Sequence, residues 1–276
     1  MAVAILRDSG NQSVYFKFQT SLEGANQMKL IFPILAVAGL LSAGCASVPA
    51  MRTGLTTTTP VTQNRDHAIY DWQQRHAEIL EYNRTHQPRV VIIGDSIIHY
   101  WGGEPAAPKA WARTAWENAF FGVTVENLGF GWDRTENVLW RIQHGELDGI
   151  KPKLIIIKIG TNNTGINTDE EIAAGIEAVC ALAHRKQPDA KILLLGILPR
   201  RDEKPPRPVI TDRVNQRLQS RLGKISWLTY CDLGGSFRQA DGRVDAALFK
   251  DGVHVNPAGY EILAARIHEE IAVLLK

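Results

Sequence analysis

Val90-Val91-Ile92-Ile93-Gly94-Asp95-Ser96 is the stretch that decides the fold of this 276-residue chain. Its four β-branched residues in a row predict a buried strand of a parallel sheet, and Gly94-Asp95 predicts a sharp turn at the end of that strand. Ser96 therefore follows the carboxyl end of a strand, which is where open α/β sheets collect their functional groups. Gly-Asp-Ser alone is also an ordinary turn, so the interpretation depends on the rest of the chain.

Strand-like and helix-like segments alternate along the chain. Apolar runs predict strands over 89–93, 123–127, 154–159, 191–196 and 225–230, and amphipathic patterns predict helices over 67–84, 109–120, 134–146, 169–187, 208–222 and 257–275. Thr168 and Asn256 are suited to cap two of these helices. We therefore predict one domain, a three-layer α/β/α sandwich whose parallel strands follow the order 2-1-3-4-5.

Composition narrows the class of protein. A net charge of +2 with no long basic run argues against a nucleic-acid partner. Three cysteines are too few for a disulfide scaffold, and Cys180 and Cys231 are expected to be buried free thiols. No pair of histidines has the spacing of metal ligands, and no phosphate-binding or dinucleotide loop is present. We therefore predict no metal ion and no cofactor.

The first 45 residues resemble an export signal. Residues 1–27 are polar and aperiodic, whereas Met28-Lys29 precedes the apolar run 30–41 and then Ser42-Ala43-Gly44-Cys45. We predict an upstream extension over 1–27, with the true start at Met28, and a lipoprotein signal over 28–45 with lipidation at Cys45. Ser42 stands where such signals usually carry leucine. A soluble secreted form cleaved after Ala50 and a buried apolar helix over 30–41 are the alternatives.

The segment that follows the signal is polar and contains proline. Residues 46–64 are therefore predicted to form a flexible tether, and residues 65–276 the folded domain. Together with the signal, this organisation predicts an exported protein of a bacterial cell envelope, or a secreted one. A lipid anchor would be its contact with the membrane, because the apolar run is too short to span a bilayer as a helix.

Asp251 and His254 lie three residues apart in a loop just before the last predicted helix. A loop of this length can fold the Asp251 carboxylate onto the Nδ1–H of His254, which leaves Nε2 to accept a proton from a serine. A capping aspartate beside a surface histidine is the alternative. Paired with a serine at a strand end, the two residues predict a nucleophile, a base and a group that orients the base, namely Ser96, His254 and Asp251.

Polar groups also follow the two strands expected on either side of the first. Asn162-Asn163 follows the strand 154–159, and side-chain amides there can donate hydrogen bonds to an oxyanion beside the backbone N–H of Ser96. An ordinary asparagine turn is the alternative. The glycines of the segment 129–131 allow backbone to approach closely. We therefore expect one polar cluster at three strand ends, with Asn163 among the substrate-binding residues.

These blocks resemble, in order and spacing, those of the SGNH (GDSL-type) hydrolases: Gly94-Asp95-Ser96, the glycine-rich turn at 129–131, Gly160-Thr161-Asn162 and Asp251-x-x-His254. Within this family, the segments 137–142 and 195–200 are similar to those of the catalytic subunits of brain-type platelet-activating-factor acetylhydrolases. The resemblance covers roughly residues 88–275. It implies a flavodoxin-like sandwich and metal-free ester hydrolysis, with Ser96 as nucleophile, His254 as base, Asp251 as its orienting group and Asn162 as an oxyanion donor.

Trp132 departs from the family pattern. It stands, after Gly131, where the family usually has a second glycine that donates its backbone N–H to the oxyanion. A backbone donor survives any side chain whose φ and ψ are accessible, so Trp132 is expected to complete the oxyanion hole with Ser96 and Asn162. Its indole is expected either to line the acyl side of the substrate site or to fill the core.

The resemblance predicts a carboxylic ester hydrolase that removes short acyl groups, above all acetyl, through an acyl-enzyme. Export favours an acetylated carbohydrate as substrate, an inference by analogy. A lipase, a lysophospholipase or a platelet-activating-factor-type acetylhydrolase is the alternative, and a binding module without activity is a third hypothesis.

Overall fold

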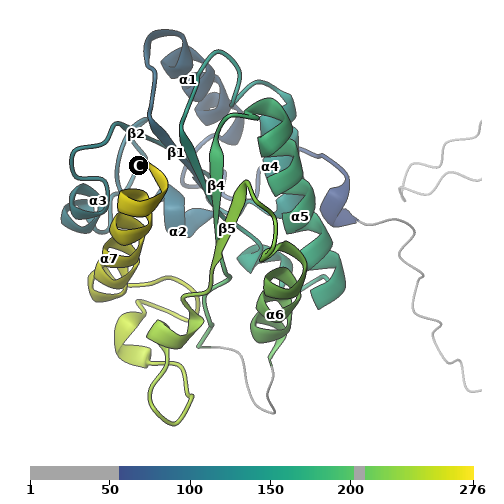
Figure 1. Ribbon diagram of the computed structural model, residues 1–276, viewed down its shortest axis with the longest axis vertical. Helices are drawn as coiled ribbons and strands as arrows, with labels where there is room; N and C mark the ends of the chain where they lie inside the picture. Colours follow the sequence, from purple (N-terminus) through teal and green to yellow (C-terminus); the bar gives the residue numbers. More distant parts are fainter. Residues whose placement is uncertain (1–55, 202–208) are drawn as a thin grey trace, which may run out of the picture. The chain divides into compact units, whose positions relative to one another are not determined.

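A parallel sheet forms the centre of the fold. The computed structural model describes residues 56–201 and 209–276. Within them the strands are β1 (Val90–Gly94), β2 (Val125–Gly129), β3 (Leu154–Lys158), β4 (Lys191–Leu195) and β5 (Leu228–Cys231). All pairings are parallel and the order is β2-β1-β3-β4-β5 (Figure 1). The predicted fold class and strand order are confirmed, with boundaries displaced by at most three residues.

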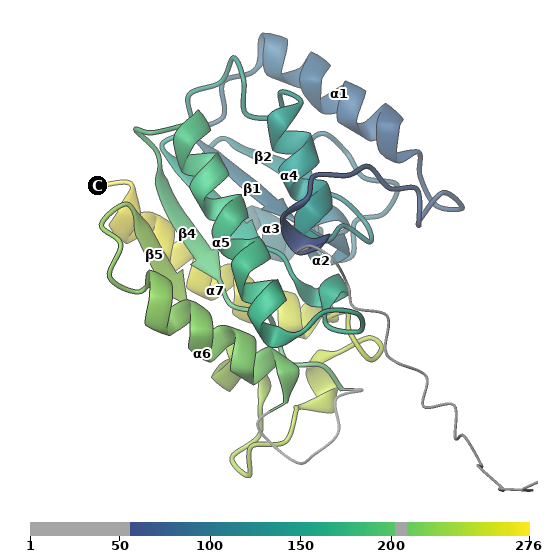
Figure 2. The same ribbon diagram turned by 90° about the vertical axis from the view of Figure 1, so that its right-hand side faces the viewer.

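Helices cover both faces of the sheet (Figures 1 and 2). One face packs against α1 (Trp72–Thr85), α4 (Thr135–Gln143), α5 (Asp169–Lys186) and α6 (Ile210–Leu222), and the other against α2 (Ser96–His99), α3 (Arg113–Ala119) and α7 (Pro257–Leu274). Successive residues of β1 alternate between the two cores: Val91 and Ile93 face one, and Val90 and Ile92 face the other. Burial on both faces explains why this strand is a continuous apolar run.

Capping residues set where several of the helices begin. Thr168 and Glu171 form a capping box at the start of α5, and Asn256 caps α7 with proline at its first turn, as predicted. The predicted helix 67–84 begins only at Trp72, because the Asp71 side chain accepts a hydrogen bond from the backbone N–H of Gln74. Short 3₁₀ helices lie at Thr56–Thr58 (η1), Thr161–Asn163 (η2), Gly234–Phe237 (η3) and Ala246–Leu248 (η4).

The prediction of a flexible tether is wrong for residues 56–64. Thr57 is fully buried; its hydroxyl donates to the carbonyl of Glu171, and its carbonyl accepts from the Thr135 hydroxyl, at 2.7 and 2.9 Å. The Asn137 amide donates to the carbonyl of Val61 at 2.8 Å. The polar composition that suggested a tether instead supplies hydrogen bonds to α4 and α5, so this segment belongs to the folded domain.

Residues 1–55 lie outside the described part of the chain. The upstream extension over 1–27, the signal over 28–45 and lipidation at Cys45 therefore stay predictions. Cys180 and Cys231 are buried free thiols, as predicted. Among the described residues, no helix has the length and apolar character needed to cross a membrane.

Glu126 of β2 is a buried carboxyl group, and neither of its oxygens has a hydrogen-bond partner among the described residues. Burial raises its pKa from 4.5 to about 8; Glu146 adds to the rise and Arg75 opposes it. The unfolded chain loses this proton at a lower pH than the folded protein. Glu126 therefore costs stability progressively as pH rises from its unfolded pKa to about 8, by up to about 1.4 kcal/mol per pH unit.

Replacing Glu126 with glutamine should remove this pH-dependent cost. We expect the free energy of unfolding of Glu126→Gln, relative to the wild type, to increase between pH 5 and pH 8, as measured by urea denaturation. Glu117→Gln, at an exposed position of α3, serves as the control and should show no such trend. A difference that stays constant between pH 5 and pH 8 would contradict the assignment.

Candidate active site

The carboxyl ends of β1, β2 and β3 lie side by side. Gly94 of β1 is in register with Gly129 of β2 and Lys158 of β3, so Ser96 follows the middle strand of the three. A Cβ atom at Gly129 would lie 2.3 Å from the backbone nitrogen of His99. Only glycine lets the short helix α2, which begins at Ser96, pack this closely against β2.

Asp95 fixes the turn in front of Ser96. One oxygen of its buried carboxylate accepts the backbone N–H of Ile97 at 3.0 Å, and the other lies 3.2 Å from Nζ of Lys158. Lys158 also donates to the hydroxyl of Thr161 at 3.1 Å. Burial lowers the pKa of the Lys158 ammonium, which Asp95 counteracts. The ion pair thus ties the turn before Ser96 to the end of β3.

Ser96, His254 and Asp251 form one hydrogen-bonded chain, as the sequence predicts. His254 Nδ1 lies 2.8 Å from Asp251 Oδ2, and His254 Nε2 lies 2.9 Å from the Ser96 Oγ. Because Nδ1–H donates to the carboxylate, Nε2 is the acceptor and the Ser96 hydroxyl donates to it. This is the arrangement in which a serine hydroxyl transfers its proton to histidine as its oxygen attacks an electrophile.

The loop that carries His254 is held by Asp251 itself. The second carboxylate oxygen accepts the backbone N–H groups of Val253 and His254, at 2.8 and 2.7 Å. Partial burial raises the pKa of Asp251, but these two N–H groups and the His254 ring together outweigh it, so its pKa lies below the usual range. The carboxylate is therefore charged at neutral pH and can stabilise a protonated His254.

Trp111 is a neighbour of the triad that sequence reasoning missed. Its ring lies edge to face with the His254 ring at a centroid distance of 5.0 Å, and the Lys250 ammonium lies 4.3 Å from its centroid on the same indole. Trp111 precedes α3 and is more than 140 residues from His254 in sequence. No local pattern connects the two residues, so this contact becomes visible only in the folded structure.

The turn after β2 places Trp132 in an unusual backbone conformation. The Asp133 N–H donates to the carbonyl of Phe130, and Trp132, at the third position of this turn, has a φ of 62°. It is the one non-glycine residue in the described ranges with a positive φ, a conformation that costs about 1–2 kcal/mol. The side chain is 50 % exposed, so of the two predicted roles the core-filling one is wrong.

Three candidate donors remain for an oxyanion. The Gly131 N–H is engaged, because it donates to Nδ1 of His99 at 3.0 Å, whereas no acceptor in the described residues takes the Trp132 N–H. The Asn162 amide donates one N–H to the carbonyl of Asp133 at 2.9 Å, which leaves its second N–H. Ser96 lies in the first turn of α2, where backbone N–H groups lack helical acceptors.

The prediction that Asn163 binds substrate is wrong. Its side chain is fully buried, and its amide donates to Glu136 and to Asn167, at 3.1 and 3.2 Å. Its side-chain oxygen Oδ1 accepts the backbone N–H of Thr135 at 3.2 Å. Within η2, Asn162 therefore faces the loop after β2, whereas Asn163 anchors η2 to the start of α4.

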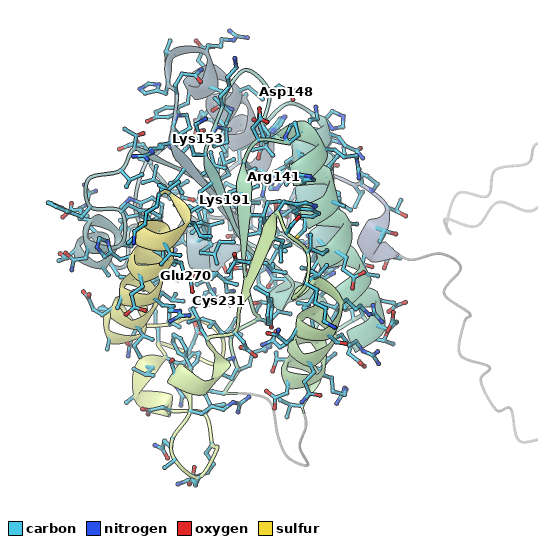
Figure 3. The ribbon with its side chains drawn as sticks, in the orientation of Figure 1. Arg141, Asp148, Lys153, Lys191, Cys231 and Glu270 are labelled. Carbon is cyan, nitrogen blue, oxygen red and sulfur yellow. The ribbon has the colours of Figure 1, made fainter. Side chains whose placement is uncertain are left out.

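A buried ionic network of Arg141, Asp133 and Glu146 lies next to the turn that contains Trp132. Arg141 of α4 is fully buried and donates to Asp133 at 2.8 Å and to Glu146; Figure 3 labels it on the side of the sheet that α4 and α5 cover. Burial raises the pKa of Asp133 to about 6, a rise that Arg141 and the Trp72 and Gln63 side chains limit. In the described ranges, no group of three or more His, Cys, Asp or Glu side chains is placed to hold a metal ion.

Comparison with known proteins agrees with this geometry. The model of the GDSL-like lipase/acylhydrolase family matches residues 92–262. The platelet-activating factor acetylhydrolase IB subunit alpha2 of Rattus norvegicus is 35 % identical over 205 residues, which cover 74 % of this chain and 85 % of the relative. The match includes both the serine and the histidine blocks of the triad within one family domain.

Solved structures share the fold at lower identity. A GDSL-like lipase of Bacteroides thetaiotaomicron aligns with a TM-score of 0.54 at 21 % identity, over 72 % of this chain and 97 % of its own. A carbohydrate esterase of family 3 from Talaromyces cellulolyticus aligns with a TM-score of 0.52 at 17 % identity, over 67 % and 97 %. By its family match, its relatives and its fold, this chain belongs to the GDSL-like lipase/acylhydrolase family and is an esterase.

Proposed function

We propose that this esterase works through an acyl-enzyme on Ser96, and the hydrogen-bonded chain from Ser96 to Asp251 is the observation that carries the proposal. The Ser96 Oγ attacks the ester carbonyl while its proton passes to His254 Nε2. The oxyanion accepts the N–H groups of Ser96, Trp132 and Asn162. His254 then protonates the leaving alcohol, and water, deprotonated by His254, releases the acid and restores the hydroxyl.

We expect Asp251→Asn to lower kcat/KM for ester hydrolysis by roughly 10²–10⁴-fold, the range for loss of the orienting carboxylate in a serine triad. The oxygen of the introduced amide would keep the two backbone N–H groups of Val253 and His254, so its NH2 group would face the ring and donate to Nδ1. His254 would then carry its proton on Nε2, the wrong nitrogen for accepting the serine proton, and its charged form would lose the nearby carboxylate. Initial rates on an acetate ester measure the effect. Asp241→Asn, an exposed aspartate, is the control. An unchanged rate in Asp251→Asn would mean that another group orients His254.

We further propose that the acyl group is short, above all acetyl, and that the alcohol is a carbohydrate. Trp132, whose backbone N–H is one of the candidate oxyanion donors, exposes half of its side chain, and its indole can limit the length of the acyl chain. Trp111 lies against His254, which serves the leaving alcohol, and flat indole rings suit the C–H faces of sugars. The Talaromyces protein is a carbohydrate esterase and the rat relative an acetylhydrolase, which is consistent with both parts of the proposal.

Export to a bacterial cell envelope, by lipidation at Cys45 or by secretion after cleavage near Ala50, is part of the same proposal and is supported by the sequence of residues 28–45. A lipase, a lysophospholipase or a platelet-activating-factor-type acetylhydrolase is the alternative, which the identity to the rat relative favours. A binding module without activity is the third candidate, and the complete triad argues against it.

A series of nitrophenyl esters from acetate to palmitate, together with acetylated sugars and an acetylated phospholipid, tests the proposal. We expect the highest kcat/KM on acetate and on acetylated sugars. Trp132→Ala should shift the acetate-to-octanoate ratio of kcat/KM toward octanoate, because each buried methylene contributes about 0.8 kcal/mol. Trp111→Ala, on the alcohol side, is the matched control and should leave that ratio unchanged. A preference for long chains in the wild type would favour the lipase alternative.

A further inference from the structure

Residues 63–70 hold the turn that contains Trp132. The carbonyl of Gly131 accepts two hydrogen bonds from this segment, from Nε2 of Gln63 at 3.0 Å and from the hydroxyl of Tyr70 at 2.9 Å. Arg65 donates to the carbonyl of Trp132 at 3.1 Å. Gln63 is buried, and the Tyr70 ring packs edge to face against His99 at a centroid distance of 4.7 Å. The Gln63 and Tyr70 side chains, which donate to the Gly131 carbonyl, are therefore themselves held in fixed positions.

The Gly131 carbonyl and the Trp132 N–H belong to the same peptide unit. In a trans peptide these two groups point in opposite directions. Two donors on the carbonyl therefore set the direction of the N–H, which points away from Gln63 and Tyr70. They also polarise the amide, which strengthens its N–H as a donor.

This orientation runs against the local preference of the chain. A positive φ at the third position of a turn favours glycine, whereas tryptophan there favours the related turn with a negative φ. The two turns differ by rotation of the central peptide, here Gly131–Trp132, through about 180°. That rotation would reverse the Trp132 N–H and remove it from the oxyanion. A chain with tryptophan at this position thus needs contacts from outside the turn.

We propose that Gln63 and Tyr70, which we call the carbonyl clamp, are positioning residues that present the Trp132 N–H to the oxyanion. The clamp takes over the role that a glycine at position 132 would fill by its own conformational preference. This inference rests on the proposed function, because it requires the Trp132 N–H to act in ester hydrolysis.

The test measures kcat and KM on an acetate ester for clamp variants with tryptophan or glycine at position 132. We expect Tyr70→Phe to lower kcat about fivefold and Gln63→Ala/Tyr70→Phe about 50-fold with little change in KM, within the loss expected for one oxyanion donor. In the Trp132→Gly background the same changes should lower kcat less than about threefold, because glycine keeps the turn without the clamp.

Tyr230→Phe is the matched control, because it removes a buried tyrosine hydroxyl that has no hydrogen-bond partner within residues 56–201 and 209–276, and kcat should be unchanged. Equal losses of kcat in the two backgrounds, or no loss in either, would overturn the clamp. Melting temperatures identify variants that fail to fold, and a crystal structure of Gln63→Ala/Tyr70→Phe should then show the Gly131 carbonyl reversed. An unchanged carbonyl would also overturn it. A wild type without esterase activity would instead refute the proposed function.

Discussion

Ser96→Ala is expected to lower kcat/KM for acetate ester hydrolysis by about 10⁴- to 10⁶-fold, the loss that follows removal of the nucleophile in serine triads. The Ser96 side chain donates to His254 and makes no other hydrogen bond in the described residues. The substitution should therefore leave the melting temperature nearly unchanged. Residual hydrolysis would come from binding and from the oxyanion donors.

Two further variants test whether the loss of activity in Ser96→Ala is specific to the nucleophile. Ser220→Ala removes an exposed hydroxyl from α6 and should retain full activity. His254→Ala/Ser96→Ala should lose little more than Ser96→Ala alone, because residues that act as a unit give non-additive losses. Activity of Ser96→Ala within tenfold of the wild type would refute the assignment of the nucleophile.

Arg141→Met should cause the largest loss of stability. The guanidinium is fully buried and pairs with two buried carboxylates, Asp133 and Glu146, and it also donates to the carbonyl of Leu128 at 3.2 Å. Removing it leaves both carboxylates without their cation, which typically lowers the free energy of unfolding by about 3–5 kcal/mol. Urea denaturation at pH 7.5 measures the loss.

The pH dependence of this stability loss, and a comparison with an arginine at the surface, test whether the two buried carboxylates cause it. The pKa of Asp133 is already raised to about 6, so at pH 5.5 the Asp133 carboxyl group freed from Arg141 can accept a proton and the loss should be smaller than at pH 7.5. Arg84→Met breaks an exposed pair with Glu81, where the arginine is 72 % exposed, and should cost less than about 1 kcal/mol. Equal losses of unfolding free energy in Arg141→Met and Arg84→Met would contradict the conclusion that burial makes the Arg141 ion pairs important for stability.

The sheet and its order were predictable because parallel strands buried on both faces leave long apolar runs in the sequence, as in β1 and β3. The helix α2 was not predicted, since its four residues are too few to show a helical period. Its position instead depends on Asp95 as a cap and on Gly129, whose missing side chain admits its backbone.

The triad was predictable because its base and orienting group lie in one loop, three residues apart, and its serine follows a strand. The remainder of the site depends on contacts between distant segments. Which of Asn162 and Asn163 faces outward is decided by η2, and no periodicity reports it. The segment 56–64 reads as a tether because its polar groups find their partners only in α4, α5 and the turn at Trp132.

Labelling with a fluorophosphonate tests the central claim most directly, because such probes phosphonylate activated serines by displacing fluoride. Intact mass should show one adduct per chain in the wild type, peptide mapping should place it on Ser96, and loss of activity should follow the extent of labelling. Ser96→Ala should take up no label, and Ser220→Ala should label like the wild type. An adduct on another serine, or an active enzyme that takes up no label, would contradict the assignment of Ser96 as the nucleophile.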